Sequence, residues 1–493
     1  MSSPVEFLLI TELNIVRQSD LPIYVQVSNG ITQLITSGKL LPGQKLPGSR
    51  SLASQLNLHR KTINMAFDEL LQQGFLESIP QKGTYVASHI PKLDPQSWSA
   101  VSHQQTAPKA GFDFHQHKSL KFPYLVHKTG LVIDEGLPDL RLSPIEDIQR
   151  TYRNMLSRTY QLKHWSYGSP YGDEWLREEY AKYLRNTRGL LVNAENVLIT
   201  RGSQMAIYLA SVLMLNQGAK VGVGHLNYQT ANYTLVHFGA ELVHIPVDEH
   251  GMNTEMLEDY CQKNQLTAVY VTPHHHHPTT ATLSADRRMH LLQLSKQYGF
   301  AIIEDDYDYD FHYERSPLLP LASVDQGGQV VYIGGLSKII SPALRIGFLV
   351  GPSDFIESAA YYRRIMDRQG DSIMERAIAQ LMANGDLARH SKKALKVYRE
   401  RRDAFAEHLD QLSESLNYQK PSGGMAFWVG FDKSRPLADL SKQLKKEGLE
   451  ITNWENYDPH KQYHNHIRMG FASLNEEERR RAFEILERVL NRM

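Results

Sequence analysis

One lysine in this chain has the surroundings of a covalent attachment site for a cofactor. Lys338 follows the apolar run 330–333 and a turn of small residues, a position that can hold its amine partly away from water. Burial disfavours the charged form of an amine and so favours the nucleophilic form. The nearby Ser337 and Arg345 offer a hydroxyl and a guanidinium to a phosphate. A Schiff-base lysine flanked by phosphate ligands is what pyridoxal 5'-phosphate (PLP) requires.

Other side chains at the ends of apolar runs support the same cofactor. Asp305 closes one run, where a carboxylate can pair with the protonated pyridine nitrogen, and Tyr307 beyond it can bond the ring 3-oxygen. Ser203 and Gln204 open a helix after a second run, where backbone N–H groups can hold the phosphate. Tyr228 follows a third run and can stack on the ring. Singly, each is typical of an ordinary turn or helix start, but jointly they predict a PLP site.

The apolar runs themselves predict a sheet that positions these residues. Beyond residue 128, short apolar runs alternate with amphipathic helical patterns, which is typical of a largely parallel α/β sheet buried on both faces. Long helical patterns follow residue 352, and the Lys/Arg run between 392 and 402 is expected to be a solvated helix face. The predicted strands are 197–200, 221–223, 268–272, 301–304, 330–333 and 347–350.

The N-terminal region has a different pattern. Helical periodicities with apolar residues over 27–35, 52–56 and 63–71 precede two extended runs, 75–79 and 84–87. Ser49 is the predicted N-cap of the second helix. Three helices and a hairpin within about seventy residues match a winged helix-turn-helix. A small helical domain that binds protein is the alternative.

The charge of this region favours DNA as its partner. Residues 21–88 contain six Lys/Arg and three Asp/Glu, whereas the whole chain has 54 of each kind. Bases at the start of the third helix are well placed, because a recognition helix enters the major groove with its N-terminal residues. The predicted DNA contacts are a reading surface of His59, Arg60, Lys61, Thr62 and Asn64, and three phosphate-positioning residues, Arg50, Lys82 and Gly83.

Length and composition set the expected organisation. A chain of 493 residues is too long for one core. We expect a lead-in over 1–20, a winged helix-turn-helix over 21–89, a linker rich in Pro, Ser and Gln over 90–127, and a larger domain over 128–493. The single cysteine, Cys261, excludes an intrachain disulfide and fits a reducing compartment. No apolar stretch is long enough to cross a bilayer, so a cytoplasmic protein without a membrane partner is expected.

These motifs resemble known families. Residues 46–53, 59–63 and 83–86 resemble the winged-helix domain of GntR-family regulators, and residues 128–493 resemble the fold-type I aminotransferases. The whole chain resembles the MocR subfamily of GntR regulators, which includes GabR- and PdxR-type proteins. The resemblance implies an α/β architecture, in which an N-terminal winged helix-turn-helix is joined by a linker to an aminotransferase-like domain that binds PLP.

The resemblance also implies roles for individual residues. Tyr167 matches a tyrosine that reaches the phosphate in the partner subunit, and Arg468 matches the arginine that clamps the α-carboxylate of an amino-acid ligand. In the DNA-binding domain, Arg50, Arg60, Thr62 and Gly83 match positions that contact operator DNA. In the cofactor site, Lys338 matches the Schiff-base lysine, Asp305 and Tyr307 the ring partners, Tyr228 the stacking aromatic, and Ser203, Gln204, Ser337 and Arg345 the phosphate ligands.

One segment departs from the family pattern. The usual Ser-His-Gln-aromatic-Pro-Thr-Gly segment is replaced over 274–280 by four histidines, Pro278 and two threonines. His277 stands where aminotransferases often have asparagine, and Thr280 stands for a glycine and is expected to alter the loop backbone. Four histidines also suggest a metal. Side chains alternate on an extended segment, so only pairs such as His274 and His276 converge, and no metal site is predicted.

The leading expectation is a transcription regulator that binds PLP and senses an amino-acid-like effector or PLP itself. The family implies a head-to-tail, domain-swapped homodimer on paired DNA half-sites. One alternative is an active aminotransferase with an accessory DNA-binding domain, which would also need Lys338, Asp305 and Arg468. The fused winged helix favours the regulator. A scaffold that no longer binds PLP is disfavoured by the retained ligand set.

Overall fold

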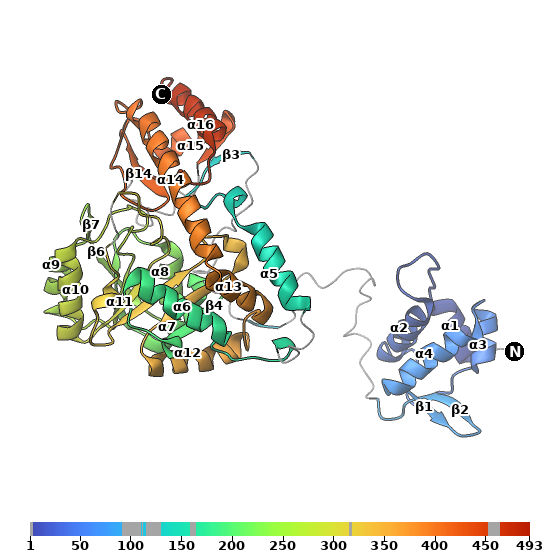
Figure 1. The fold of residues 1–493 in the computed structure, drawn as a ribbon. Coiled ribbons are helices and arrows are strands. Elements are labelled where there is room, and N and C mark those ends of the chain that lie inside the picture. The colour runs from blue at the N-terminus through green and yellow to red at the C-terminus, as the bar shows by residue number, and fades with distance from the viewer. Residues whose placement is uncertain are drawn as a thin grey trace. The chain divides into compact units, whose positions relative to one another are not determined.

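The structure is a computed structural model that describes residues 3–90, 110, 112–114, 130–157, 164–314, 318–451 and 464–493. The chain divides into two compact units, Met1–Gln116 and His117–Met493 (Figure 1). The expected linker, 90–127, lies almost entirely outside the described residues. The expected four-part division of the chain therefore stays a prediction.

The smaller unit is a helical core with a β-hairpin. Its apolar residues at helical spacing meet in one core, in which Val27 and Ile31 of one helix and Ile63 and Leu70 of another are fully buried. The predicted winged helix-turn-helix is confirmed. Its elements are α1 (Pro4–Glu12), α2 (Ile23–Thr36), α3 (Ser49–Gln55), α4 (Arg60–Gln72) and the antiparallel strands β1 (Leu76–Ile79) and β2 (Gly83–Val86).

Two local features of this unit differ from the sequence-based expectation. The segment expected to be a lead-in contains α1, whose Leu9 is fully buried in the core. The chain after α1 approaches α2 at Gly30, where any Cβ would collide with the Leu13 side chain. The prediction of Ser49 as N-cap was wrong by one position, because Gly48 has the extended N-cap backbone (φ −62°, ψ 146°) and Ser49 is already helical.

A seven-stranded sheet within the described residues forms the centre of the larger unit (Figure 1). The sheet is parallel except for β12, which runs antiparallel to both of its neighbours. The six predicted strands are confirmed. Within this sheet only β6 was missed, because the exposed Glu241 and His244 interrupt the apolar residues of this edge strand. The strands, in sheet order, are β4 (Val197–Thr200), β12 (Gly347–Val350), β11 (Val330–Gly335), β10 (Ala301–Asp305), β9 (Ala268–Val271), β5 (Lys220–Gly224) and β6 (Glu241–Ile245).

Helices cover both faces of this sheet, as the apolar runs predict. Successive side chains of a strand point to opposite faces, and accordingly Ile303 of β10 packs in one cluster with α7 and α8, whereas Ile302 packs in another with α9 and α10. On the first face lie α7 (Ser203–Met214), α8 (Gln229–His237) and α12 (Ser353–Met366). On the second face lie α6 (Glu174–Arg188), α9 (Thr254–Cys261) and α10 (Ala285–Tyr298).

The C-terminal elements gather around one end of the long helix α14 (Asp386–Asp410), together with an early strand (Figure 1). That strand, β3 (Leu131–Ile133), pairs in parallel with β15 (Leu449–Ile451), although more than 300 residues separate them. The same end holds β13 (Leu416–Tyr418), β14 (Ala426–Phe431), β16 (His466–Gly470), α15 (Leu437–Lys446) and α16 (Glu476–Leu490). The remaining elements are α5 (Ile145–Ser157), α11 (Leu321–Val324), α13 (Ser372–Ala383), β7 (Val247–Asp248) and β8 (Gly251–Met252).

Helix α14 corrects the expectation for the basic run. Lys392, Lys393, Lys396 and Arg399 are exposed, as a solvated face requires. Arg402 is buried instead, and its guanidinium lies 3.0 Å from Glu314 and 2.8 Å from Asp403. The residue falls on the same helix face as the buried Tyr398 and Phe405, so its position in the helix, not its charge, decides its burial. No helix in the described ranges is both long and apolar enough to span a membrane.

Candidate functional site

Most of the residues predicted to bind the cofactor meet at one edge of the central sheet. Parallel strands present their carboxyl ends at a common edge, where α/β proteins bind ligands. Arg345 lies at the same edge. It precedes β12, and because β12 is antiparallel to its neighbours, its amino end lies beside their carboxyl ends. At this edge lie Ser203 and Gln204 after β4, Tyr228 after β5, the histidine run after β9, Asp305 and Tyr307 at the end of β10, and Ser337 and Lys338 after β11.

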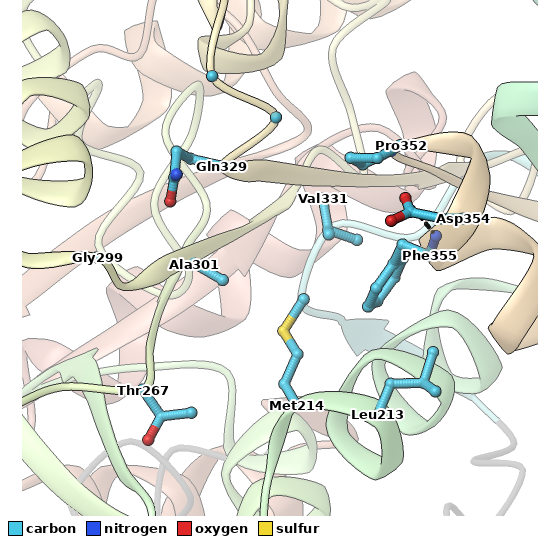
Figure 2. A pocket seen from close by; sticks show the side chains of 12 residues that line it. Leu213, Met214, Thr267, Gly299, Ala301, Gln329, Val331, Pro352, Asp354 and Phe355 are labelled. Atoms are coloured by element: carbon cyan, nitrogen blue, oxygen red, sulfur yellow. Dashed lines mark hydrogen bonds between the residues drawn. The ribbon is translucent and has the colours of Figure 1, made fainter.

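A cavity of about 620 Å³ lies at the opposite edge of the sheet. Figure 2 shows its lining, which includes Met214 at the end of α7, Gln329 before β11 and Phe355 at the start of α12. None of the predicted cofactor ligands lines this cavity. The predicted cofactor site therefore lies at the carboxyl ends of the parallel strands and not in this cavity.

Lys338 is held at this edge with its amine out of bulk water. Its Nζ donates a hydrogen bond to the carbonyl oxygen of Gly136 at 2.5 Å. Burial lowers the pKa of Lys338, and the nearby positive charge of Arg468 lowers it further. Both effects favour the neutral, nucleophilic amine that a Schiff-base lysine needs.

Asp305 has the geometry of a partner for the pyridine nitrogen. The side chain is 3 % exposed, and Tyr270 of β9 donates to its Oδ2 at 2.7 Å. Its Oδ1 is buried and takes no hydrogen bond from the described residues. Burial raises the pKa of Asp305 to about 7. A buried carboxylate oxygen without a donor is what a protonated ring nitrogen would satisfy, so this residue fits PLP. Tyr270 was not predicted, because no local pattern distinguishes it from the other residues of its apolar run.

A helix start and a guanidinium form a cradle suited to the phosphate. Helix α7 begins after Gly202, which has φ +80°, and a Cβ at Gly202 would lie 2.9 Å from the Arg345 guanidinium. The Arg345 Nη2 donates to the carbonyl oxygen of Arg201 at 2.6 Å, which fixes it beside the helix. The Gln204 amide donates instead to Thr234 of α8 at 2.6 Å. At the helix start, Ser203 thus offers a hydroxyl and Gln204 its main-chain N–H.

Arg468 is buried, with 1 % of its surface exposed, and its positive charge acts on Lys338. Its Nε donates to the carbonyl oxygen of Glu135 at 2.9 Å, and its Nη1 to that of Pro278 at 3.2 Å. Its Nη2 lies 3.2 Å from the Tyr307 hydroxyl, which itself donates to the carbonyl oxygen of His275 at 2.7 Å. The guanidinium is therefore fixed beside the tyrosine predicted to contact the cofactor ring.

The four histidines point to different partners. The His274 Nε2 lies 2.5 Å from the carbonyl oxygen of Leu318, and the His276 Nε2 lies 2.8 Å from that of Leu226. The expected convergence of His274 and His276 is not observed, because each ring binds a carbonyl of a different segment. In the part of the chain that the structure describes, no group of three or more His, Cys, Asp or Glu side chains is placed to hold a metal ion.

The last histidine and Thr280 shape the wall of the site. The His277 ring lies 5.2 Å from the Tyr228 ring and 6.3 Å from the Tyr307 ring, centroid to centroid, at steep angles. Burial lowers the pKa of His277 well below its usual value, so this ring is neutral. Thr280 has φ +61°, a left-handed conformation that is rare for a β-branched residue. Thr280 therefore has a backbone conformation that is typical of glycine, the residue that it replaces in the family pattern.

Tyr167 is the one predicted cofactor residue that the structure does not bring to this edge. Its side chain is 73 % exposed, and the Arg368 guanidinium lies 4.0 Å from its ring centroid. The segment is tied down next to it, because the Gly168 N–H donates to the Gln369 side chain. That Tyr167 completes the site of a second subunit stays a prediction.

The predicted DNA contacts are exposed on α3, α4 and the hairpin turn. Arg60 and Lys61 begin α4 and are exposed, and Thr62 and Asn64 are half-buried. The exposed His59 is the N-cap of α4, and its Nδ1 accepts from the Lys61 N–H at 3.2 Å. The sequence did not reveal this capping role, because histidine is not a usual N-cap. The three phosphate-positioning residues, Arg50 of α3 and Lys82 and Gly83 of the hairpin, are also exposed.

Replacing Arg60 with alanine is expected to weaken operator binding by about 1–3 kcal/mol, the worth of one good base contact. Gel-shift titration of the full-length protein would measure this change. Lys39→Ala is the matched control, since Lys39 is exposed and its ammonium lies 2.7 Å from Glu12. Equal affinities of Arg60→Ala and the unchanged protein would remove Arg60 from the reading surface.

Comparisons with known proteins find a match for each of the two units. Residues 23–86 match the family described as bacterial regulatory proteins, gntR family, and residues 159–486 match aminotransferase class I and II. The chain is 27 % identical over 458 residues to the HTH-type transcriptional regulator TauR of Rhodobacter capsulatus, covering 90 % of this chain and 91 % of TauR. It is 27 % identical over 455 residues to the HTH-type pyridoxine biosynthesis transcriptional regulator PdxR of Corynebacterium glutamicum, covering 92 % and 93 %.

Solved structures give the same fold for the larger unit. Pyrococcus horikoshii kynurenine aminotransferase superposes with a TM-score of 0.69 at 27 % identity, covering 74 % of this chain and 92 % of that one. Fold, site and matches together define a DNA-binding regulator built from a winged helix and an aminotransferase-type domain. The chain belongs to the aminotransferase class I and II family and, as a whole, to the MocR subfamily of GntR regulators. Its cofactor is PLP, for which Lys338 and the unpartnered oxygen of Asp305 are suited.

Proposed function

We propose that the aminotransferase-type domain is a sensor, which binds an amino-acid-like effector or PLP itself and thereby changes how the winged helix binds operator DNA. One observation carries this proposal. A fully buried arginine, Arg468, lies beside Lys338 in a chain that also has a DNA-binding domain. Its planar fork suits a carboxylate, so a carboxylate clamp and a cofactor lysine share one site.

Different residues of the site would bind different parts of the cofactor and of the effector. When bound, PLP supplies an aldehyde that reacts with amines and a ring that withdraws electrons. Asp305 would hold the ring nitrogen, Tyr307 the ring oxygen, and the start of α7 with Arg345 and Ser337 the phosphate. Arg468 would hold the α-carboxylate of the effector and so direct its amine toward Lys338. The neutral His277 and Tyr228 would line the wall beside the ring.

The link to DNA needs only a difference in affinity between arrangements of the protein. A ligand that favours one arrangement shifts the population toward it. We propose a homodimer, domain-swapped, with paired half-sites as its target, as in the family that the chain belongs to. The exposed Tyr167 supports this, because it would reach the phosphate of the second subunit.

A working aminotransferase is the second candidate. Lys338, Asp305 and Arg468 are arranged as that reaction would require. The chain is also 27 % identical over 357 residues to aromatic-amino-acid aminotransferase 1 of Thermococcus litoralis. In this candidate the winged helix would be an accessory domain.

A titration of the PLP-loaded full-length protein separates the two candidates. Amino acids and amines would be added singly, and the visible spectrum, keto-acid production and affinity for a duplex selected from random sequence would be measured. A sensor is expected to change its spectrum and its DNA affinity without steady keto-acid production. Steady production with unchanged DNA affinity would favour the enzyme, and no response to any ligand would contradict the sensor.

A further inference from the structure

The loop that follows β3 contacts both of the groups that would bind the effector. The carbonyl oxygen of Glu135 accepts from the Arg468 Nε at 2.9 Å, and that of Gly136 accepts from the Lys338 Nζ at 2.5 Å. Glu135 therefore contacts the carboxylate clamp through its own carbonyl and directly precedes the residue that contacts the cofactor lysine. Whatever binds to both groups comes close to this residue.

The carboxylate of Glu135 has no structural partner among the described residues. The preceding Asp134 is fully engaged, because its Oδ1 accepts from the Gly136 N–H at 2.7 Å and the Leu137 N–H at 2.8 Å, and its Oδ2 from Ser473 at 2.5 Å. The half-buried Glu135 side chain takes no hydrogen bond and no ion pair within the described ranges, and its negative charge acts on Lys338 and Tyr228. A half-buried charge of this kind is stabilised by a positive partner.

The other charged groups of the site have partners or tasks of their own. Asp308 lies 2.7 Å from His275, and Asp305 faces the ring nitrogen position. The nearby histidines supply no positive charge, because burial lowers the pKa of His276 to about 4 and that of His277 well below its usual value. Once Arg468 holds the effector's α-carboxylate, Glu135 is the half-buried acidic side chain next to Lys338 that has neither a hydrogen bond nor an ion pair among the described residues, whereas the fully buried Asp308 is paired with His275.

We propose that Glu135 determines specificity, and that it selects amino acids whose side chain ends in a positive charge, such as an ω-amine. This inference rests on the proposed sensor function, because it needs an amino acid held by Arg468. A cationic side chain would pair with Glu135 in a partly dry site, where charge pairs are stronger than in water. An acidic side chain would be repelled.

The test compares amino acids that have the same carbon chain and differ only in the terminal ammonium group. L-Lysine and L-norleucine, and L-ornithine and L-norvaline, would be titrated into the PLP-loaded full-length protein in a calorimeter. We expect the cationic member of one pair to bind about tenfold more tightly, the effect of one partly desolvated ion pair. In Glu135→Gln, which keeps the shape but not the charge, this preference is expected to disappear while L-norleucine binds as before. Glu178→Gln, which removes an exposed carboxylate of α6, is the control and is expected to keep the preference.

The outcomes separate this inference from the proposed function. Equal binding of the charged and uncharged members by the unchanged protein, or a preference that persists in Glu135→Gln, would overturn the role of Glu135 and leave the sensor intact. Binding of none of these four amino acids would overturn the role of Glu135 and would also contradict a sensor of amino acids, which leaves PLP itself as the effector of the proposed sensor. Equal binding of the two members of each pair by the unchanged protein would exclude the role of Glu135 even where the variant fails to fold.

Discussion

Lys338→Ala is expected to abolish covalent attachment of PLP and with it the visible absorbance of the lysine-bound cofactor. The loss should be complete, because the Lys338 amine lies among the predicted cofactor ligands and burial lowers its pKa, which favours the nucleophilic form. Absorbance spectra of the purified protein would measure it. Borohydride reduction followed by peptide mapping of the unchanged protein should place the cofactor on the peptide that contains Lys338.

A control keeps this result specific. Lys296 of α10 is exposed, so Lys296→Ala should keep the full absorbance. A Lys338→Ala protein that still shows the visible band, or a label mapped to another peptide, would contradict the assignment and with it the cofactor chemistry proposed above. Among the described residues the Lys338 amine hydrogen-bonds only the Gly136 carbonyl oxygen, so the variant should still fold, which thermal denaturation would verify.

Arg468→Ala should remove the response to amino-acid effectors while PLP stays bound. Truncating one partner of a buried, hydrogen-bonded charge pair costs about 2–5 kcal/mol, or roughly 30- to 5,000-fold in the dissociation constant. Calorimetric titration with amino acids would measure the loss, and the visible spectrum would show that the cofactor remains. Arg468→Lys keeps the charge without the fork and is expected to recover only part of the affinity.

The effector-dependent change in DNA affinity is the second measurement for Arg468→Ala. Arg399→Ala, which removes an exposed arginine of α14, should respond to effectors like the unchanged protein. An Arg468→Ala protein whose DNA binding still shifts with the effector at the original concentration would refute the clamp. Loss of PLP in the same variant would instead assign Arg468 to holding the cofactor's tyrosine, Tyr307, in place.

The sheet and the main site residues were predictable because their signals are local. An apolar run ends in Asp305, and another ends in the small turn before Lys338, so type and spacing along a few residues are enough. The contacts that complete the site are not local. The Tyr270–Asp305 bond depends on which strands pair, and Arg468 meets Glu135 across 333 positions. No short-range pattern contains that information.

The errors in the smaller unit and in α14 have the same origin. Charge suggested an exposed Arg402, but its position in the helix places it on the buried face. The segment before residue 20 lacks a regular helical stripe, although α1 packs Leu9 into the core. His59 caps α4 through a ring nitrogen, a role that residue preferences do not predict. In each case the tertiary surroundings decided the outcome.

The pairing of β3 with β15 has a mechanical consequence. The strand that carries the Glu135–Gly136 turn is hydrogen-bonded to a C-terminal strand and not to the central sheet, yet its two carbonyls anchor Lys338 and Arg468. Arg468 lies on β16, so a shift of the C-terminal elements would move the turn and the arginine together and would break only the contact between Gly136 and Lys338. Covalent attachment of a cofactor to Lys338 would remove the same contact, so the state of this one amine would affect how firmly the C-terminal elements are held beside the central sheet.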